Sequence, residues 1–222
     1  MRTFDTLDRA ATPDGRWLTL HHRDGDFFIY LDGEELMSTR ATGSEELLAE
    51  LACRELATLD GPRILIGGLG FGYTLRAALA LLPPRAKVLV AEILPAVVDW
   101  NRTHLDAIHR QGLEDSRVEI RTGDVWNLLD GRAGLDAILL DVDNGPSAWC
   151  LDSNSRLYSP QGLQQIHRSL AAGGMLAIWS AYSDDAFVKR LAKSGFAVTV
   201  ERVRARGRKG ARHTIFLARR SP

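Results

Sequence analysis

The sequence predicts an α/β fold built on a doubly wound, mostly parallel sheet of seven strands. Three observations support this prediction. From residue 63 onward, short unbroken apolar runs alternate with helical segments, which is the pattern of strands buried on both faces. A glycine-rich segment follows the first of these runs, and acidic residues follow the next three. The last two β-type runs have no helix between them and predict a closing hairpin.

Each element of the sheet follows from its local sequence. Strands are expected at 64–66, 88–91, 117–121, 136–140 and 175–180, with the hairpin at 196–201 and 213–218. Helices are expected at 73–82, 96–110, 161–170 and 184–193. Pro83 and Pro84 end the first helix, and Pro95 suits the opening turn of the second. Such alternation produces a parallel sheet with helices on both faces.

The glycine-rich segment GGLGFG, residues 67–72, predicts a nucleoside-binding loop between the first strand and the first helix. Glycine permits a sharp turn and close approach of a ligand, while the free N–H groups of the helix start point toward it. Glu92 follows Gly72 by about 20 residues, where a carboxylate can accept hydrogen bonds from both ribose hydroxyls. The expected nucleoside-binding residues are Gly67, Gly68, Gly70, Gly72 and Glu92. A tight turn without a ligand is the alternative role for the glycines.

The glycine spacing distinguishes between cofactor classes. A dinucleotide fingerprint would need glycine at position 73, given Gly68 and Gly70, but the chain has Tyr73. The observed spacing suits a nucleoside without a pyrophosphate, such as S-adenosylmethionine or its decarboxylated form. The predicted Rossmann-like sheet is therefore of the type found in S-adenosylmethionine-dependent methyltransferases.

Two further acidic positions lie at the ends of predicted strands. Asp124 follows the third strand, with Val125 beside it, and could accept a hydrogen bond from the exocyclic amine of adenine. Capping of the next helix is the alternative role for Asp124. Asp141 follows the fourth strand, with Asp143 and Asn144 shortly after it. Because ligands bind at the carboxyl ends of the strands in such sheets, these residues are expected to share one site with the glycine segment.

Asp141 is the candidate catalytic residue, and Asp143 and Asn144 are grouped with it. An amine nucleophile is protonated near neutral pH, since its unperturbed pKa is about 10. A carboxylate opposite the expected sulfonium group can attract the ammonium form, orient it and take up a proton as attack proceeds. An Asx turn that closes the strand is the alternative role for Asp141.

The N-terminal residues have a different pattern. β-type runs at 17–20 and 27–31 flank Asp24-Gly25, a dipeptide that favours a hairpin turn. A helix over 44–59 should follow, with Ser44 as its N-cap. We therefore expect an N-terminal β-hairpin appendage over residues 1–43 and a nucleoside-binding, methyltransferase-like domain over 44–222.

Composition restricts the partners and the compartment. The 222-residue chain has 28 basic and 28 acidic residues, so its overall charge favours neither nucleic acid nor a membrane. Cations cluster between Arg202 and Arg212, but without aromatic residues for base stacking we expect a solvated loop. Cys53 and Cys150 lack metal-ligand spacing, which indicates reduced thiols and no metal centre. No apolar stretch is long enough to span a membrane or resembles a signal peptide, so the expected location is the cytoplasm.

These stretches resemble the spermidine synthase, or polyamine aminopropyltransferase, family. ILIGGLGFG resembles the family's glycine-rich loop, VLVAE its ribose-binding strand, DSRVEIRTGD its adenine-side segment and DAILLDVDNGP its catalytic loop. RLYSPQGLQQIHRSLAAGGMLAIW, residues 156–179, is similar to a later region of the family. The resemblance implies decarboxylated S-adenosylmethionine as donor, Asp141 as catalytic aspartate and an amine such as putrescine as acceptor.

The chain departs from the family in the acceptor half of the site. Gly70 replaces an aspartate for the donor's amino end, and Asn144 replaces a second aspartate of the catalytic loop. The family's N-terminal helix supplies Tyr, His and Asp to the amine channel. At that place the chain has Ser44, Glu45, Glu46 and Glu50. Two alternatives therefore stay open: a methyltransferase using S-adenosylmethionine on a small molecule or RNA, and a non-catalytic nucleoside-binding protein. A homodimer is the candidate assembly.

Overall fold

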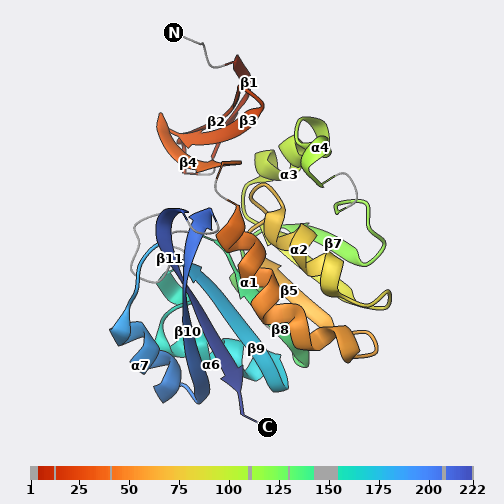
Figure 1. Cartoon of the computed structure of the whole chain (residues 1–222), viewed down its shortest axis with the longest axis vertical. Coiled ribbons are helices and arrows are strands. Elements are labelled where there is room, and N and C mark those ends of the chain that lie inside the picture. Colours follow the sequence, from red (N-terminus) through yellow and green to blue (C-terminus); the bar gives the residue numbers. More distant parts are fainter. Residues whose placement is uncertain are drawn as a thin grey trace.

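The structure is a computed structural model that describes residues 5–12, 14–40, 42–109, 112–129, 131–142, 155–206 and 209–221. A seven-stranded sheet with helices on both faces forms the body of the molecule. A separate four-stranded antiparallel sheet, formed by the N-terminal residues, lies above it in Figure 1. The predicted fold class is confirmed.

The N-terminal sheet has the strand order β1-β2-β3-β4. Its strands are β1 (Asp5–Ala11), β2 (Trp17–Arg23), β3 (Asp26–Leu31) and β4 (Glu34–Ser38). β2 and β3 form the predicted hairpin, and its turn residues Asp24 and Gly25 have φ of 54° and 87°, the left-handed values that such a turn needs. β1 and β4 were not expected from the sequence, because β1 is mostly polar and exposed. The division at residues 43 and 44 stays a prediction.

The larger sheet has the order β10-β11-β9-β8-β5-β6-β7. Its strands are β5 (Arg63–Gly67), β6 (Lys87–Glu92), β7 (Val118–Thr122), β8 (Leu135–Leu140), β9 (Leu170–Ser180), β10 (Phe196–Arg206) and β11 (Lys209–Arg220). Strands β5 to β9 are parallel, whereas β11 is antiparallel to both β9 and β10. The order reverses at β5, which pairs with β6 on one side and β8 on the other. In sheets of this kind such a switch point opens a crevice at the carboxyl ends of the strands.

Helices pack on the two faces of this sheet and make two cores. The helices are α1 (Gly43–Cys53), α2 (Tyr73–Leu81), α3 (Pro95–Thr103), α4 (Asp106–His109), α5 (Val125–Leu129), α6 (Pro160–Ser169) and α7 (Asp185–Lys193), with a 3-10 turn, η1, at Arg54–Thr58. Residues of α1 and α2 share one core with Ile64 and Ile66, and residues of α6 and α7 share the other with Leu65. Successive side chains of a strand point to opposite faces, so β5 contributes to both cores.

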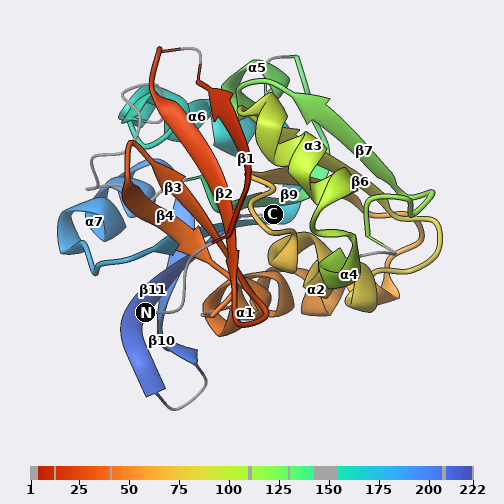
Figure 2. The same cartoon turned by 90° about the horizontal axis from the view of Figure 1, so that it is seen from above.

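A third core joins the N-terminal sheet to the glycine segment. Its members include Leu18, Leu20, Ile29, Phe71 and Tyr73. Trp100 of α3 belongs to the same core and donates a hydrogen bond from Nε1 to Asp8 of β1, at 2.7 Å. Figure 2, seen from above, shows the N-terminal strands lying across the end of the larger sheet. The small sheet therefore covers the segment that is expected to bind the nucleoside.

Several element boundaries differ from expectation. Helix α1 begins at Gly43 after Thr42, so the prediction that Ser44 is the N-cap was wrong. The helix expected over 96–110 is divided: α3 ends at Thr103 and α4 follows after a break. β9 begins at Leu170, and β10 and β11 extend to Arg206 and Lys209, so most of the cationic segment expected in a loop belongs to strands.

Candidate active site

The glycine segment crosses the backbone that leaves β8. Gly68 has φ of +89°, and a Cβ atom placed on it would lie 2.1 Å from the carbonyl oxygen of Asp141. The backbone N–H of Asp141 donates to the carbonyl oxygen of Gly67 at 2.8 Å. No side chain fits between these two segments, so Gly68 is needed for backbone packing as well as for the turn. The structure thus brings the predicted nucleoside loop and the predicted catalytic residue together.

Asn101 of α3 holds the middle of the glycine loop. This residue is 1% exposed, and its Nδ2 group donates to the carbonyl oxygens of Gly70 at 2.8 Å and Val97 at 2.7 Å. The sequence analysis missed Asn101. The signal that could have identified it is a polar residue among the apolar positions of an otherwise amphipathic helix.

Glu92, at the end of β6, lies beneath the same loop. Its Oε2 accepts from the N–H of Leu69 and its Oε1 from the N–H of Leu94, both at 2.9 Å. Glu92 is 6% exposed, and this burial raises the pKa of its carboxyl group, while the backbone hydrogen bonds oppose the rise. Glu92 therefore fixes the loop through backbone groups. The expected contact of Glu92 with ribose stays a prediction.

Asp124 lies between β7 and α5, at the edge of the sheet, and makes two contacts with other residues. Its Oδ1 accepts from the N–H of Trp126 at 2.8 Å, and its Oδ2 forms an ion pair with Arg156. The first contact is the helix-capping role that the sequence left open, here at the start of α5. Val125 is buried, and its methyl group would be 3.1 Å from a Cβ on Gly67. The expected contact of Asp124 with adenine stays a prediction.

Asp141 directly follows β8 at the carboxyl edge of the sheet. Its Oδ2 accepts a hydrogen bond of 3.0 Å from the hydroxyl of Thr74, a buried residue in the first turn of α2. The sequence analysis missed Thr74, because the two residues are 67 positions apart in the chain. Asp143 and Asn144, the other predicted catalytic residues, lie outside the described residues.

Glu45, in the first turn of α1, lies near the same carboxylate. The Thr74 hydroxyl oxygen is 3.4 Å from the backbone carbonyl oxygen of Glu45. Burial, the charge of Asp141 and, to a smaller extent, the charge of Glu46 raise the pKa of Glu45 well above its ordinary value. The site therefore contains two neighbouring carboxyl groups, of which the sequence analysis assigned a role to only one.

A hydrogen bond to β11 holds the first turn of α1 in place. The Ser44 hydroxyl and Nδ1 of His213 are 2.9 Å apart. The ring of His213 packs edge to face on Trp179 of β9, with centroids 4.7 Å apart. Burial lowers the pKa of His213, so its ring is neutral at neutral pH. Because Ser44 precedes Glu45, this contact positions the Glu45 backbone.

Curated relatives of this chain are named polyamine aminopropyltransferases. The protein from Mycobacterium tuberculosis is 29% identical over 193 residues, which cover 82% of this chain and 35% of the relative. The protein from Aeropyrum pernix is 30% identical over 156 residues, which cover 66% of this chain and 46% of the relative. The spermidine synthase from Thermotoga maritima superposes with a TM-score of 0.76 at 18% identity, covering 97% of this chain and 73% of that structure. The chain is therefore similar in sequence to polyamine aminopropyltransferases and in fold to spermidine synthases.

The chain spans only about a third (35%) of the length of the Mycobacterium tuberculosis relative that it matches. A spermidine synthase in complex with the transition state analogue AdoDATO superposes with a TM-score of 0.75 at 17% identity, covering 97% of this chain and 72% of that structure. At these identities the structural likeness shows the fold. No family model matches the chain.

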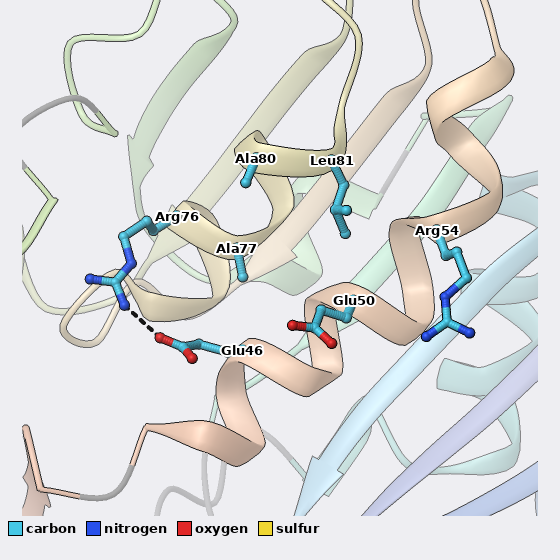
Figure 3. A pocket seen from close by; sticks show the side chains of 7 residues that line it. All are labelled: Glu46, Glu50, Arg54, Arg76, Ala77, Ala80 and Leu81. Atoms are coloured by element: carbon cyan, nitrogen blue, oxygen red, sulfur yellow. Dashed lines mark hydrogen bonds and ion pairs between the residues drawn. The ribbon is translucent and has the colours of Figure 1, made fainter. Parts of the chain in front are cut away.

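Beside the site, a groove of about 460 Å³ lies between α1 and α2 (Figure 3). Its lining residues are Glu46, Glu50, Arg54, Arg76, Ala77, Ala80 and Leu81. Glu46 forms an ion pair with Arg76 across the groove, at 2.5 Å. The charge of Glu46 is therefore compensated on this surface by a cation from the neighbouring helix.

The basic segment near the C-terminus is an exposed two-stranded ribbon. Arg204 of β10 lies directly opposite Arg212 of β11 in the strand register, and both residues are exposed, as is Arg202. Like charges directly opposite each other destabilise a strand pair. Exposure to water reduces the repulsion between these two arginines. The structure thus places these cations in water.

The described residues were also searched for metal sites and for membrane-spanning helices. Within residues 5–142 and 155–221, apart from the gaps given above, no group of three or more His, Cys, Asp or Glu side chains is arranged to hold a metal ion. None of the described helices has the length and apolar character required to cross a bilayer.

Proposed function

We propose that the chain is an aminopropyltransferase that moves an aminopropyl group from decarboxylated S-adenosylmethionine to an amine. The observation that carries the proposal is the backbone contact between Gly68 and Asp141, because it sets the expected nucleoside loop beside the expected catalytic carboxylate. The sequence similarity to polyamine aminopropyltransferases and the fold similarity to spermidine synthases support the same reaction.

In this proposal the donor occupies the crevice at the switch point of the sheet. The residues that would hold its nucleoside are Gly67, Gly68, Gly70, Gly72, Glu92, Asp124 and Val125. Glu92 suits the ribose because it lies at the carboxyl end of β6, directly against the glycine loop whose Leu69 N–H it binds. Gly70 leaves room above the loop, since the nearest atom to a Cβ built there is Sδ of Met37 at 3.6 Å.

The proposed reaction is a displacement at carbon. The acceptor nitrogen, after losing a proton, attacks the propyl carbon bonded to the sulfonium. A C–N bond forms as the C–S bond breaks, the bonding pair stays on sulfur, and the neutral thioether methylthioadenosine leaves. Asp141 accepts the proton from the ammonium form of the acceptor and releases it to water. The Thr74 hydroxyl, bonded to Oδ2 of Asp141, keeps the carboxylate oriented toward the nitrogen.

The choice of donor is the most direct test of this proposal. Calorimetry should show tighter binding of decarboxylated S-adenosylmethionine than of intact S-adenosylmethionine. Incubation of the decarboxylated donor with putrescine should release methylthioadenosine together with the alkylated amine. Preference for the intact donor and release of S-adenosylhomocysteine would instead identify a methyltransferase. Donor binding without turnover of any amine would support a non-catalytic nucleoside-binding protein.

A further inference from the structure

The parallel strands of the larger sheet begin around a pocket at the edge opposite the candidate active site. The first residues of β5, β6, β7 and β8 all line it, and they are Arg63, Lys87, Val118 and Leu135. The pocket has a volume of about 580 Å³, which is within the range of small-molecule binding sites. The glycine loop and Asp141 lie at the other ends of these strands, so the proposed reaction makes no use of this pocket.

Positive charge predominates in this pocket. Among its lining residues, the charged side chains are Arg63, Lys87, Arg117, Arg132 and Glu119. Arg117 forms an ion pair with Asp115, at 2.7 Å. Glu119, the acidic residue of this set, forms an ion pair with Arg121, at 2.5 Å. Local pairs therefore compensate two of the five charges, and those of Arg63, Lys87 and Arg132 remain.

No carboxylate pairs with these three cations in the part of the chain that the structure describes. The side chains of Lys87 and Arg132 have no hydrogen-bond partner there either. Arg63 donates from Nη1 to the backbone carbonyl oxygen of Ala133, at 3.1 Å. Asp136 accepts from the backbone N–H of Arg63, at 2.7 Å, and so bonds the main chain of this residue instead of its guanidinium group. The three positive charges are therefore not neutralised by any described ion pair.

The backbone holds the three cations near one another. Arg63 and Lys87 are partners in the strand register, so their side chains leave adjacent strands about 4.8 Å apart and on the same face. Arg132 belongs to the loop before β8, and this loop packs against Arg63. Ala133 accepts the bond from Nη1 of Arg63, and a Cβ on Gly134 would lie 3.5 Å from the same atom. Like charges that are held together repel one another, and a bound anion removes this repulsion.

An anion with several charges matches this arrangement better than a monoanion does. A guanidinium group can bind two phosphate oxygens at once, and a lysine ammonium adds a compact point charge. A compound with two or more phosphate groups supplies enough oxygen atoms and enough negative charge for all three cations. A single carboxylate would leave most of the repulsion in place.

We infer that this pocket binds a small anion with two or more phosphate groups, held by Arg63, Lys87 and Arg132. The inference goes beyond the proposed function and does not depend on it, because the donor crevice lies at the carboxyl ends of the strands. The five residues of β5 separate the two edges by about 15 Å, since each strand residue adds about 3.3 Å.

Calorimetric titration of inorganic pyrophosphate tests this inference. Lys87→Gln and Arg132→Gln each remove one charge from the pocket without breaking a described side-chain contact. Arg85→Gln is the matched control, because it removes the same charge from a side chain that is 77% exposed, pairs with Asp60 and lies outside the pocket. We expect each pocket variant to bind pyrophosphate about 10-fold more weakly, the effect of losing one charge-assisted hydrogen bond. The double variant should lose more affinity, and Arg85→Gln should bind like the wild-type protein.

Urea unfolding provides a second measurement that depends on the same cations. A ligand that binds only the folded protein stabilises it, so pyrophosphate should raise the urea midpoint of the wild-type protein and of Arg85→Gln but not that of the double variant. Arg204→Gln, in the exposed basic ribbon, reports binding of pyrophosphate at that other cationic surface. If the double variant does not fold, the two single variants carry the test.

ADP contains two phosphate groups and a nucleoside, so it distinguishes a nucleotide from a free oligophosphate. ADP binding that is tighter than pyrophosphate binding and is weakened by Lys87→Gln supports a nucleotide as the ligand, whereas tighter pyrophosphate binding supports a free oligophosphate. Four results would overturn the inference: no pyrophosphate binding by the wild-type protein, equal affinity in the wild-type protein and both pocket variants, an equal loss in Arg85→Gln or Arg204→Gln, or tighter binding of citrate than of pyrophosphate.

Discussion

At the scale of single residues, Asn101 shows how a buried polar group shapes the site. Its amide nitrogen bonds the carbonyl oxygens of Gly70 and Val97, whereas its Oδ1 has no partner among the described residues. A buried oxygen without a hydrogen bond lowers the stability of the fold. Any stabilisation by Asn101 must therefore come from the hydrogen bonds that its Nδ2 group donates. One of those donors fixes the carbonyl group of Gly70 and, with it, the direction of the loop.

We expect Asn101→Ala to lower the free energy of unfolding by about 1–3 kcal/mol, because it leaves the Gly70 carbonyl oxygen without its bond and opens space in the core. The variant should also bind methylthioadenosine more weakly. Denaturant unfolding and calorimetry measure the two effects. Asn127→Ala, at an exposed position of α5, is the control and should change stability by less than about 0.5 kcal/mol. Wild-type ligand affinity in Asn101→Ala would show that Asn101 only packs α3.

The raised pKa of Glu45 makes a prediction for stability as a function of pH. A carboxyl group whose pKa is higher in the folded state contributes stability below its unfolded value, near 4.5, and loses that contribution as pH rises through the folded value. Glutamine undergoes no such loss. Urea unfolding should therefore show Glu45→Gln and wild-type protein equally stable near pH 4, and the variant more stable near pH 8. A variant less stable near pH 8 would contradict the account, in which Asp141 and Glu46 oppose the charge of Glu45.

At the scale of elements, the exits of β5 and β8 form one rigid corner. The N–H of Asp141 bonds the carbonyl oxygen of Gly67, which extends the pairing of the two parallel strands past their ends. Gly68 then packs directly on the Asp141 backbone. Helix α2 starts from this loop and returns Thr74 to the carboxylate of Asp141. The proposed donor loop and the proposed catalytic residue are consequently parts of a single packed unit.

Gly68→Ala should disrupt this corner. A Cβ there meets the Asp141 carbonyl oxygen at 2.1 Å, whereas a Cβ on Gly131 meets no atom within 4 Å, although both glycines have positive φ. Gly131→Ala therefore measures the conformational cost alone, about 1–2 kcal/mol. We expect Gly68→Ala to lower the free energy of unfolding by about 1–3 kcal/mol more and to abolish methylthioadenosine binding. Equal effects of the two substitutions in chemical unfolding would show that the crossing tolerates a side chain.

At the scale of the whole molecule, the strand and helix order of the larger sheet could be predicted because its buried strands are unbroken apolar runs. The small sheet was predicted in part, since β1 has polar side chains and its position depends on contacts with β2 and on the bond from Trp100 to Asp8. The lengths of β10 and β11 were also underestimated because of polar side chains. The arginines at their ends suggest a loop, but the backbone pairing of the two strands continues through these residues.

Much of the candidate site depends on contacts that no local pattern reveals. Glycines and acidic residues at strand ends could be identified, because the end of each unbroken apolar run shows where the strand leaves the sheet. Thr74 and Glu45 could not, since their importance comes from meeting Asp141 in the folded chain. The same holds for Ser44, which looks like a helix cap in the sequence but bonds to His213, 169 positions away.

Steady-state kinetics of Asp141→Asn with decarboxylated S-adenosylmethionine and putrescine test the central claim most directly. Asparagine keeps the size of the side chain but cannot accept the ammonium proton. We predict a fall in kcat of about 10²- to 10⁴-fold, with methylthioadenosine affinity unchanged. Turnover by Asp141→Asn at the wild-type rate would contradict the assignment of Asp141 as the group that orients and deprotonates the acceptor.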